Sequence, residues 1–142
     1  MRFIVLVKGV QESHDGRKPT LEDVAEMGKF NDQLMKAGVM LSAEGLTPSK
    51  EGARLNWGKG GTTTTVDGPF AETKELVAGF WIIEAKSRAE AIEWMRRAPF
   101  PEGSQLEIRR IAEPSDFADD AQEEIAREQK KYAEHAKKNA RA

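Results

Sequence analysis

The chain has 142 residues and no cysteine, and 22 Lys and Arg against 24 Asp and Glu leave a formal net charge of −2. This length suits one compact domain plus an appendage. The missing cysteines exclude a disulfide scaffold, thiolate metal ligation and thiol catalysis, and they favour a soluble protein of the reducing cytoplasm. The balanced charge offers no attraction to nucleic acid or to an anionic membrane, and the apolar run at the start is far shorter than the roughly 18 residues of a membrane span.

The first elements expected are a strand and a helix. Residues 2–8 contain the run FIVLV, which is apolar on both side-chain parities and therefore predicts a buried strand. After a polar loop, Thr20 and Asp23 form a capping-box pattern, and apolar residues then recur at helical spacing until Gly38, a left-handed helix stop. Gly28 costs this helix about 1 kcal/mol relative to Ala, so we expect it to permit close packing.

A second strand is expected at residues 39–43, followed by turn-like sequence. Residues 53–57 alternate in polarity, residues 58–61 are rich in glycine, and a threonine run with Val66 supplies β-branched residues for a returning arm. The segment 53–66 is therefore predicted to be a hairpin inserted between two strands of the main sheet.

The second half of the domain repeats the strand and helix order. Residues 79–84 contain FWII, again apolar on both parities. Ser87 and Glu90 repeat the capping-box pattern before a helix that Pro99 ends. Residues 105–111 then form the last strand, with alternate apolar side chains facing inward.

This order of elements predicts an α+β domain, ferredoxin-like βαββαβ with an inserted β-hairpin, over residues 1–112. Two helices cover only one face of such a sheet, yet its central strands carry apolar side chains on both faces. We expect the second face to pack against that of a second copy, so that a homodimer forms a dimeric α+β barrel. Coverage of that face by the hairpin or by the C-terminal segment of the same chain is the alternative.

Residues 113–142 differ in composition from the rest. The segment from Asp116 to Ala140 is rich in Ala, Glu, Lys and Gln, with a narrow apolar stripe that includes Ile125 and Tyr132. Acidic residues come early and basic residues late, as the helix dipole prefers. The mixed polar face favours a solvent-exposed C-terminal helix over a membrane-surface or calmodulin-binding helix.

The most distinctive run is DGPFAETKE, residues 67–75. Asp67 and the following glycine are typical of a tight turn, so one interpretation is a rigid corner before the next strand. In the other interpretation two of the four titratable groups in this run face a pocket as acid, base or anion clamp; the four are Asp67, Glu72, Lys74 and Glu75.

Other chemistry-bearing residues are few. His14 lies in the first loop and is a candidate general base, although an exposed histidine without a role is the simpler interpretation. His135 is expected on the surface of the C-terminal helix. The sequence has no metal-binding motif, and the glycines at 58–61 lack the context of a phosphate loop, so we expect no metal and no cofactor.

Asn31 falls on the same helical face as the apolar stripe, where a structural hydrogen bond and ligand recognition are both open. Glu44 ends a strand that otherwise looks buried. If Asn31, Glu44 and the Asp67 loop converge, they line a cleft between the first helix and the inserted hairpin, with Trp57 and Trp81 as its apolar wall.

The DGPFAETKE run, together with AGFW at 78–81, AEGL at 43–46, FN at 30–31 and AGV at 37–39, resembles the YCII-related family in its DGPF-type branch. The similarity spans residues 1–111. It implies a ferredoxin-like fold that pairs into a dimeric barrel. Some relatives are dehydrochlorinase-type or isomerase-like enzymes acting on small ring compounds, and some are encoded beside or fused to extracytoplasmic-function sigma factors.

Certain relatives are proposed to use a His-Asp pair, the His on the first helix and the Asp beyond the second. Here Met27 stands in the first place and Ala98 and Pro99 in the second, so the resemblance carries no such pair over. Two functions remain open. One is a dimeric protein that binds a small molecule in a cleft, with or without acid-base catalysis; the other is a non-catalytic domain that binds a protein such as a sigma factor.

Overall fold

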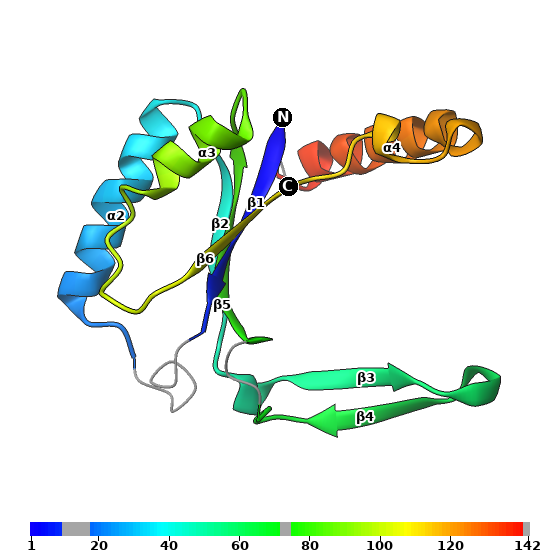
Figure 1. The fold of residues 1–142 in the computed structure, drawn as a ribbon, viewed down its shortest axis with the longest axis horizontal. Helices are drawn as coiled ribbons and strands as arrows, with labels where there is room; N and C mark the ends of the chain where they lie inside the picture. Colours follow the sequence, from blue (N-terminus) through cyan, green and yellow to red (C-terminus); the bar gives the residue numbers. More distant parts are fainter. Residues whose placement is uncertain (10–17, 72–74, 141–142) are drawn as a thin grey trace. The chain divides into compact units, whose positions relative to one another are not determined.

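The computed structural model describes residues 1–9, 18–71 and 75–140, and the chain divides after Arg110 into two compact units. The first unit contains a four-stranded antiparallel sheet with the strand order β2-β5-β1-β6, and both of its α-helices lie on one face of that sheet (Figure 1). This is the predicted ferredoxin-like arrangement. Its elements are β1 (Arg2–Lys8), α2 (Leu21–Lys36), β2 (Met40–Gly45), β5 (Val77–Glu84), α3 (Arg88–Met95) and β6 (Leu106–Arg110).

Local sequence signals set the ends of both helices. At the start of α2, the amide of Asp23 donates to Thr20 Oγ1 at 3.2 Å and the amide of Thr20 donates to Asp23 Oδ2 at 2.9 Å, so the capping box is complete. Gly38 has the expected left-handed φ of 69°. At α3 the cap is different, because the Glu90 carboxylate accepts from the amide of Lys86 rather than from that of the N-cap residue.

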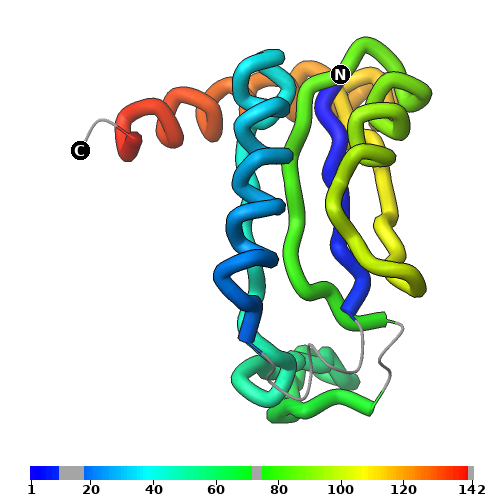
Figure 2. The backbone as a smooth tube through the Cα atoms, turned by 90° about the vertical axis from the view of Figure 1, so that its left-hand side faces the viewer, coloured from blue at the N-terminus to red at the C-terminus, as the bar shows by residue number. Residues whose placement is uncertain are grey.

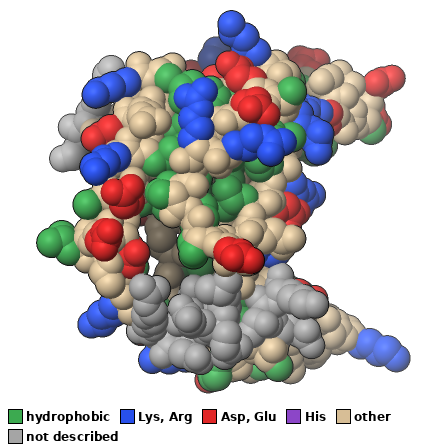
Figure 3. All heavy atoms as spheres, turned by 60° about the vertical axis from the view of Figure 1, so that its left-hand side comes forward, with side chains coloured by type: hydrophobic (Ala, Val, Ile, Leu, Met, Phe, Trp, Pro, Cys, Tyr) green, Lys and Arg blue, Asp and Glu red, His purple; other side chains and the backbone are tan. Residues whose placement is uncertain are grey.

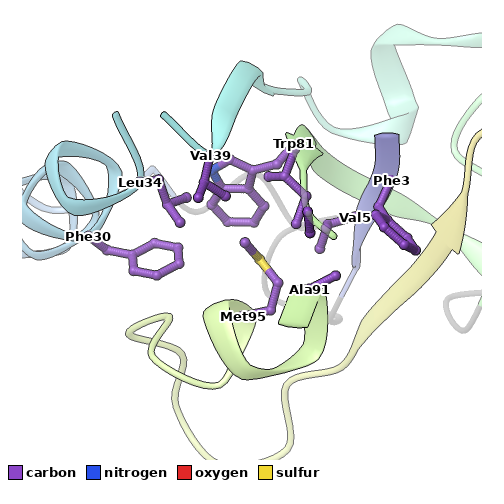
Figure 4. Packing of buried hydrophobic residues seen from close by; sticks show 10 residues of the cluster. Phe3, Val5, Phe30, Leu34, Val39, Trp81, Ala91 and Met95 are labelled. Atoms are coloured by element: carbon purple, nitrogen blue, oxygen red, sulfur yellow. The ribbon is translucent and has the colours of Figure 1, made fainter. Parts of the chain in front are cut away.

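The core lies between the sheet and the two helices. Leu34 of α2, Val5 of β1 and Ile83 of β5 are each 0% exposed, and Figure 4 shows how the side chains of the two layers meet. In Figure 2, α2 and α3 stand in front of the strands with the sheet behind them. On β1 and β5 every second side chain enters this core, as the alternation of a strand requires.

The other face of the central strands is also apolar, as predicted. Ile4 pairs with Ile82 and Leu6 with Phe80 across β1 and β5, and all four side chains are half-buried. Residues that pair directly across antiparallel strands lie on the same face, so these four form one patch. The same register puts Glu44, Glu107 and Arg109 at its edges.

The inserted hairpin consists of β3 (Ala53–Trp57) and β4 (Thr63–Asp67), which pair in the predicted antiparallel register. Every residue of both strands is exposed. None of these strand side chains is buried against the main sheet, although the Arg54 guanidinium contacts the Phe70 ring beside the hairpin. The alternative in which it folds over the open face of the sheet is wrong, because such packing would bury one of its faces.

The second unit, Ile111–Ala142, contains the C-terminal helix α4 (Gln122–Asn139). The helix begins later than the expected Asp116, because Asp116 instead accepts a 2.7 Å hydrogen bond from the amide of Glu113 and closes a separate short turn. Acidic residues occupy the first turn of α4 and lysines its last turn. None of the described helices combines the length and apolar character needed to cross a bilayer.

Candidate functional site

A cavity of about 710 Å³ lies beside the N-terminal half of α2, and we name it the α2 cavity. Its opposite wall is the segment that follows α3, and the ends of β1 and β5 contribute to its floor. Figure 3 shows a hollow on this side of the molecule with acidic side chains beside it. Its described lining consists of Val7, Lys8, Pro19, Glu22, Asp23, Val24, Glu26, Met27, Gly28, Asn31, Ala78, Pro99, Phe100, Pro101 and Ser104.

The walls of the α2 cavity are largely apolar. Met27 comes from α2, while Pro99, Phe100 and Pro101 form the facing wall. Phe100 is held in place by an edge-to-face contact with Trp81, with ring centroids 6.1 Å apart, and Trp81 makes a similar contact with Phe30 at 6.0 Å. The aromatic cluster thus fixes one wall of the cavity against the sheet.

Asn31 is the polar group at the inner end of the cavity, where α2 meets the sheet. The indole Nε1–H of Trp81 donates to Asn31 Oδ1 at 2.9 Å. An indole nitrogen only donates, so this bond fixes which end of the amide is the oxygen. Asn31 lies one helical turn after Met27, which brings both side chains to the same cavity.

The charged groups near the α2 cavity are mainly acidic. Glu22, Asp23 and Glu26 belong to the exposed first turns of α2. Asp23 is engaged in the helix cap, and Glu26 Oε1 lies 3.4 Å from Lys29 Nζ. Lys8, the one basic residue of the described lining, has its Nζ 3.7 Å from Glu107 Oε2.

The structure does not bring the predicted cleft residues together. Ala43 pairs with Trp81 and Glu44 with Phe80, so Glu44 points to the sheet face opposite Asn31. Asp67 is exposed at the end of β4, and Trp57 is 73% exposed in the hairpin. Of the residues predicted for that cleft, Asn31 lines the α2 cavity and Trp81 supports it from the sheet.

Residues 67–71 and 75 of the DGPFAETKE run are described, and the start of the run forms a packed corner. The amide of Gly68 donates to the carbonyl of Gly52 at 2.9 Å, and a Cβ built on Gly68 would lie 1.7 Å from the carbonyl oxygen of Ser49. The Gly68–Pro69 bond is cis. The Arg54 guanidinium lies 4.0 Å from the centroid of the Phe70 ring. Glycine is needed here because a side chain would collide with the neighbouring turn.

Three candidates, His14, Glu72 and Lys74, lie outside the described residues. His135 is exposed on α4, as expected, with Nε2 3.1 Å from Asn139 Nδ2. Within residues 1–9, 18–71 and 75–140, no three His, Asp or Glu side chains form a group that could hold a metal ion.

Sequence reasoning missed most of the cavity. Met27 and Pro99 were linked to a functional site only through the catalytic pair proposed at their positions in relatives, and both line the cavity. Gly28 does not serve close packing, since an added Cβ would meet no atom within 4 Å. It borders open cavity space instead. The flanking of Phe100 by two prolines was a usable signal, because proline on both sides fixes the path of a loop.

A four-stranded antiparallel sheet with two helices on one face defines a ferredoxin-like α+β domain, here with a cavity beneath its first helix. The chain belongs to the YCII-related domain family, whose model matches residues 1–115.

An uncharacterized protein of Rhizobium meliloti is 35% identical over 71 residues, which are 50% of this chain and 56% of that protein. The chain thus matches little more than half the length of this curated relative. Among solved structures, 5-chloro-2-hydroxyhydroquinone dehydrochlorinase from Burkholderia phenoliruptrix, in complex with 2,5-dihydroxybenzoquinone, is similar at a TM-score of 0.40 and 20% identity, over 83% of this chain and 100% of that one.

Proposed function

We propose that this YCII-related domain binds a small molecule in the α2 cavity. The observation that carries the proposal is a largely apolar cavity of about 710 Å³ in which the Asn31 amide is held in a fixed orientation by Trp81. Ligand sites in proteins are concave and mostly apolar, enclose roughly 300–1,000 Å³, and contain a few oriented polar groups. The α2 cavity meets each of these conditions.

The position of the cavity within the family supports this proposal. Met27 and Pro99 both line it, and these are the positions where the resemblance places the proposed His-Asp pair of certain relatives. The cavity would then correspond to the working site of those relatives, with apolar residues in place of the pair.

In the catalytic form of the proposal, the bound molecule undergoes acid-base chemistry of isomerase, lyase or dehydrochlorinase type. A general acid or base must reach the reacting proton directly or through one water. The carboxylates of Glu22 and Glu26 are the acidic groups of the described lining that are not engaged in the helix cap. We assign any such step to them, ahead of Glu44 and Asp67.

We further propose that the domain is a homodimer joined through the open sheet face. Ile4, Leu6, Phe80 and Ile82 form an apolar patch there, and burying such a patch against its own copy gives a closed two-fold interface. The exposed hairpin supplies no cover for it. Sedimentation equilibrium at micromolar concentration should give a dimer for the natural chain and a monomer for Leu6→Glu. A natural chain that sediments as a monomer would contradict this part.

The binding proposal is tested by a ligand-observed NMR screen of ring-sized fragments against the full chain. We expect Asn31→Leu to lose the fragments that bind, because the oriented amide is gone, while the control Asn56→Leu on the exposed hairpin keeps them. If no fragment binds the natural chain, or if Asn31→Leu binds them unchanged, the proposal is wrong. Loss of binding in Glu44→Ala or Asp67→Ala would return the site to the cleft that the sequence predicted.

The second candidate is a non-catalytic domain that binds a protein partner such as an extracytoplasmic-function sigma factor. It is favoured by the end of α4, where residues 130–139 are all exposed and Tyr132 is 65% exposed. Deleting residues 116–142 should abolish capture of a purified sigma factor under this function and leave fragment binding intact under the first. Both functions suit a cytoplasmic protein, which the cysteine-free sequence favours.

A further inference from the structure

The orientation of the Asn31 amide restricts what the α2 cavity can bind, and this inference rests on the proposed function. Asn31 Oδ1 is occupied by the indole hydrogen of Trp81. Within the part of the chain that the structure describes, Nδ2 has no hydrogen-bond partner. Asn31 therefore has two N–H donors to offer, while Oδ1 already accepts one of the two hydrogen bonds it can take. The amide thus favours a ligand group that accepts a hydrogen bond.

The charges around the cavity select among acceptors. The described lining holds three acidic residues, Glu22, Asp23 and Glu26, against one lysine, Lys8, whose Nζ lies 3.7 Å from Glu107 Oε2. An excess of one sign of charge in a cleft repels ligands of the same sign. A carboxylate would meet this repulsion, whereas the carbonyl oxygen of a neutral molecule would accept from Asn31 without it.

The side chains of the cavity walls indicate the shape and polarity of the rest of the ligand. Met27 on one side and Phe100 on the other leave an apolar space, and the prolines around Phe100 keep that wall in place. A methionine side chain and an aromatic ring both favour contact with a compact ring or branched hydrocarbon over a polar chain.

We propose that the α2 cavity takes a small neutral carbonyl compound, such as a cyclic ketone or a ring carboxamide. Its carbonyl oxygen accepts from Asn31 Nδ2, and its apolar body lies between Met27 and Phe100. Carboxylates with the same body are disfavoured by the acidic lining.

The proposal is tested on the full chain with matched probes that differ only in charge. Benzamide is compared with benzoate, and cyclohexanecarboxamide with cyclohexanecarboxylate, by NMR titration at neutral pH. We expect each amide to bind about tenfold more tightly than its carboxylate, the difference that one unfavourable charge interaction of modest size produces.

Two variants test separately the contribution of the Asn31 amide and that of the acidic lining. Asn31→Asp keeps an oxygen for the Trp81 indole but replaces the two donors by a carboxylate oxygen, so amide binding should fall at least about tenfold. The matched control is Asn56→Asp on the hairpin, which should bind as the natural chain does. The double variant Glu22→Gln, Glu26→Gln, on the exposed face of α2, should raise the affinity ratio of benzoate to benzamide about tenfold.

The outcomes are distinct. Carboxylates that bind the natural chain as tightly as the amides, or amide binding that survives Asn31→Asp, would overturn the ligand class and leave small-molecule binding in place. Failure of all four probes to bind would overturn both the ligand class and the proposed function.

Discussion

Two of the antiparallel strand pairs of this protein, β1 with β5 and β3 with β4, differ in what surrounds them. Both pairs have strand-forming sequences, and their register is regular apart from a shift between Val7 and Lys8 in β1. The first buries Val5 and Ile83 completely beneath two helices, whereas every residue of the second is exposed. A two-stranded hairpin alone is marginally stable in water, so pairing by itself does not stabilise a sheet. The difference shows that burial against the helices, rather than strand propensity, stabilises the domain.

The difference in stability between the two strand pairs is tested most directly by truncating one apolar residue in each pair. Ile83→Ala removes a fully buried side chain and should lower the free energy of unfolding by about 2–5 kcal/mol. Leu55→Ala, at a position 56% exposed on the hairpin, should change it by less than about 0.5 kcal/mol. Urea unfolding at one protein concentration measures both. Equal losses would mean that the hairpin is packed against a partner.

Substitution of Gly68, in the corner that joins the hairpin to the sheet, is expected to destabilise the domain much as a core substitution does. Gly68→Ala would place a methyl group 1.7 Å from a backbone oxygen, so it should destabilise the domain by at least about 1–3 kcal/mol. Gly28→Ala meets no atom within 4 Å and should stabilise α2 by about 1 kcal/mol. Thermal unfolding followed by circular dichroism compares the two, and a stable Gly68→Ala chain would refute the packed corner.

The two tryptophans, one buried and one exposed, allow the two regions to be compared with the same substitution, Trp to Phe. Trp81→Phe removes the donor to Asn31 Oδ1 in a site 5% exposed, which should cost about 1–3 kcal/mol of stability. Trp57→Phe changes an exposed side chain and should stay within about 0.5 kcal/mol. Equilibrium unfolding of both variants checks the pair; a neutral Trp81→Phe would mean that the amide finds another donor.

The smallest expected effect is in α4, where side chains interact in water. The hydrogen bond from Lys131 holds the pKa of Glu128 below its ordinary value of 4.5. A folded-state pKa below the unfolded value means that this contribution is present above pH 4.5 and is lost as pH falls through the folded pKa. Helical circular dichroism of the natural chain should therefore decline slightly more at acidic pH than that of Glu128→Gln. High salt should remove the difference, since the pair is exposed.

Local signals were sufficient for much of the fold. Thr20 with Asp23 and the left-handed Gly38 bounded α2 correctly, because a helix end is satisfied by groups within a few residues. The two-faced strands were recognised for a similar reason, since consecutive residues of a strand point to opposite faces and both sets are apolar. The predicted start of α4 was too early because the sequence around Asp116 is compatible both with a helix and with the short turn that Asp116 closes.

The candidate site was less predictable, because it depends on residues far apart in the chain. Asn31 and Trp81 are joined by one hydrogen bond across 50 positions, and no spacing rule connects them. Glu44 and Asn31 were expected to share a cleft, yet a single step in strand register puts them on opposite faces.

The sequence by itself therefore determined the order of elements, the N-cap residues of α2 and α3, the two-faced central strands and the family. Only the tertiary structure decided which residues line a common cavity, which end of the Asn31 amide is available, and that the hairpin is left exposed. The physical reason is that secondary structure follows from interactions between residues close in the sequence. A cavity is formed by segments that are far apart in the sequence, so no single segment predicts it.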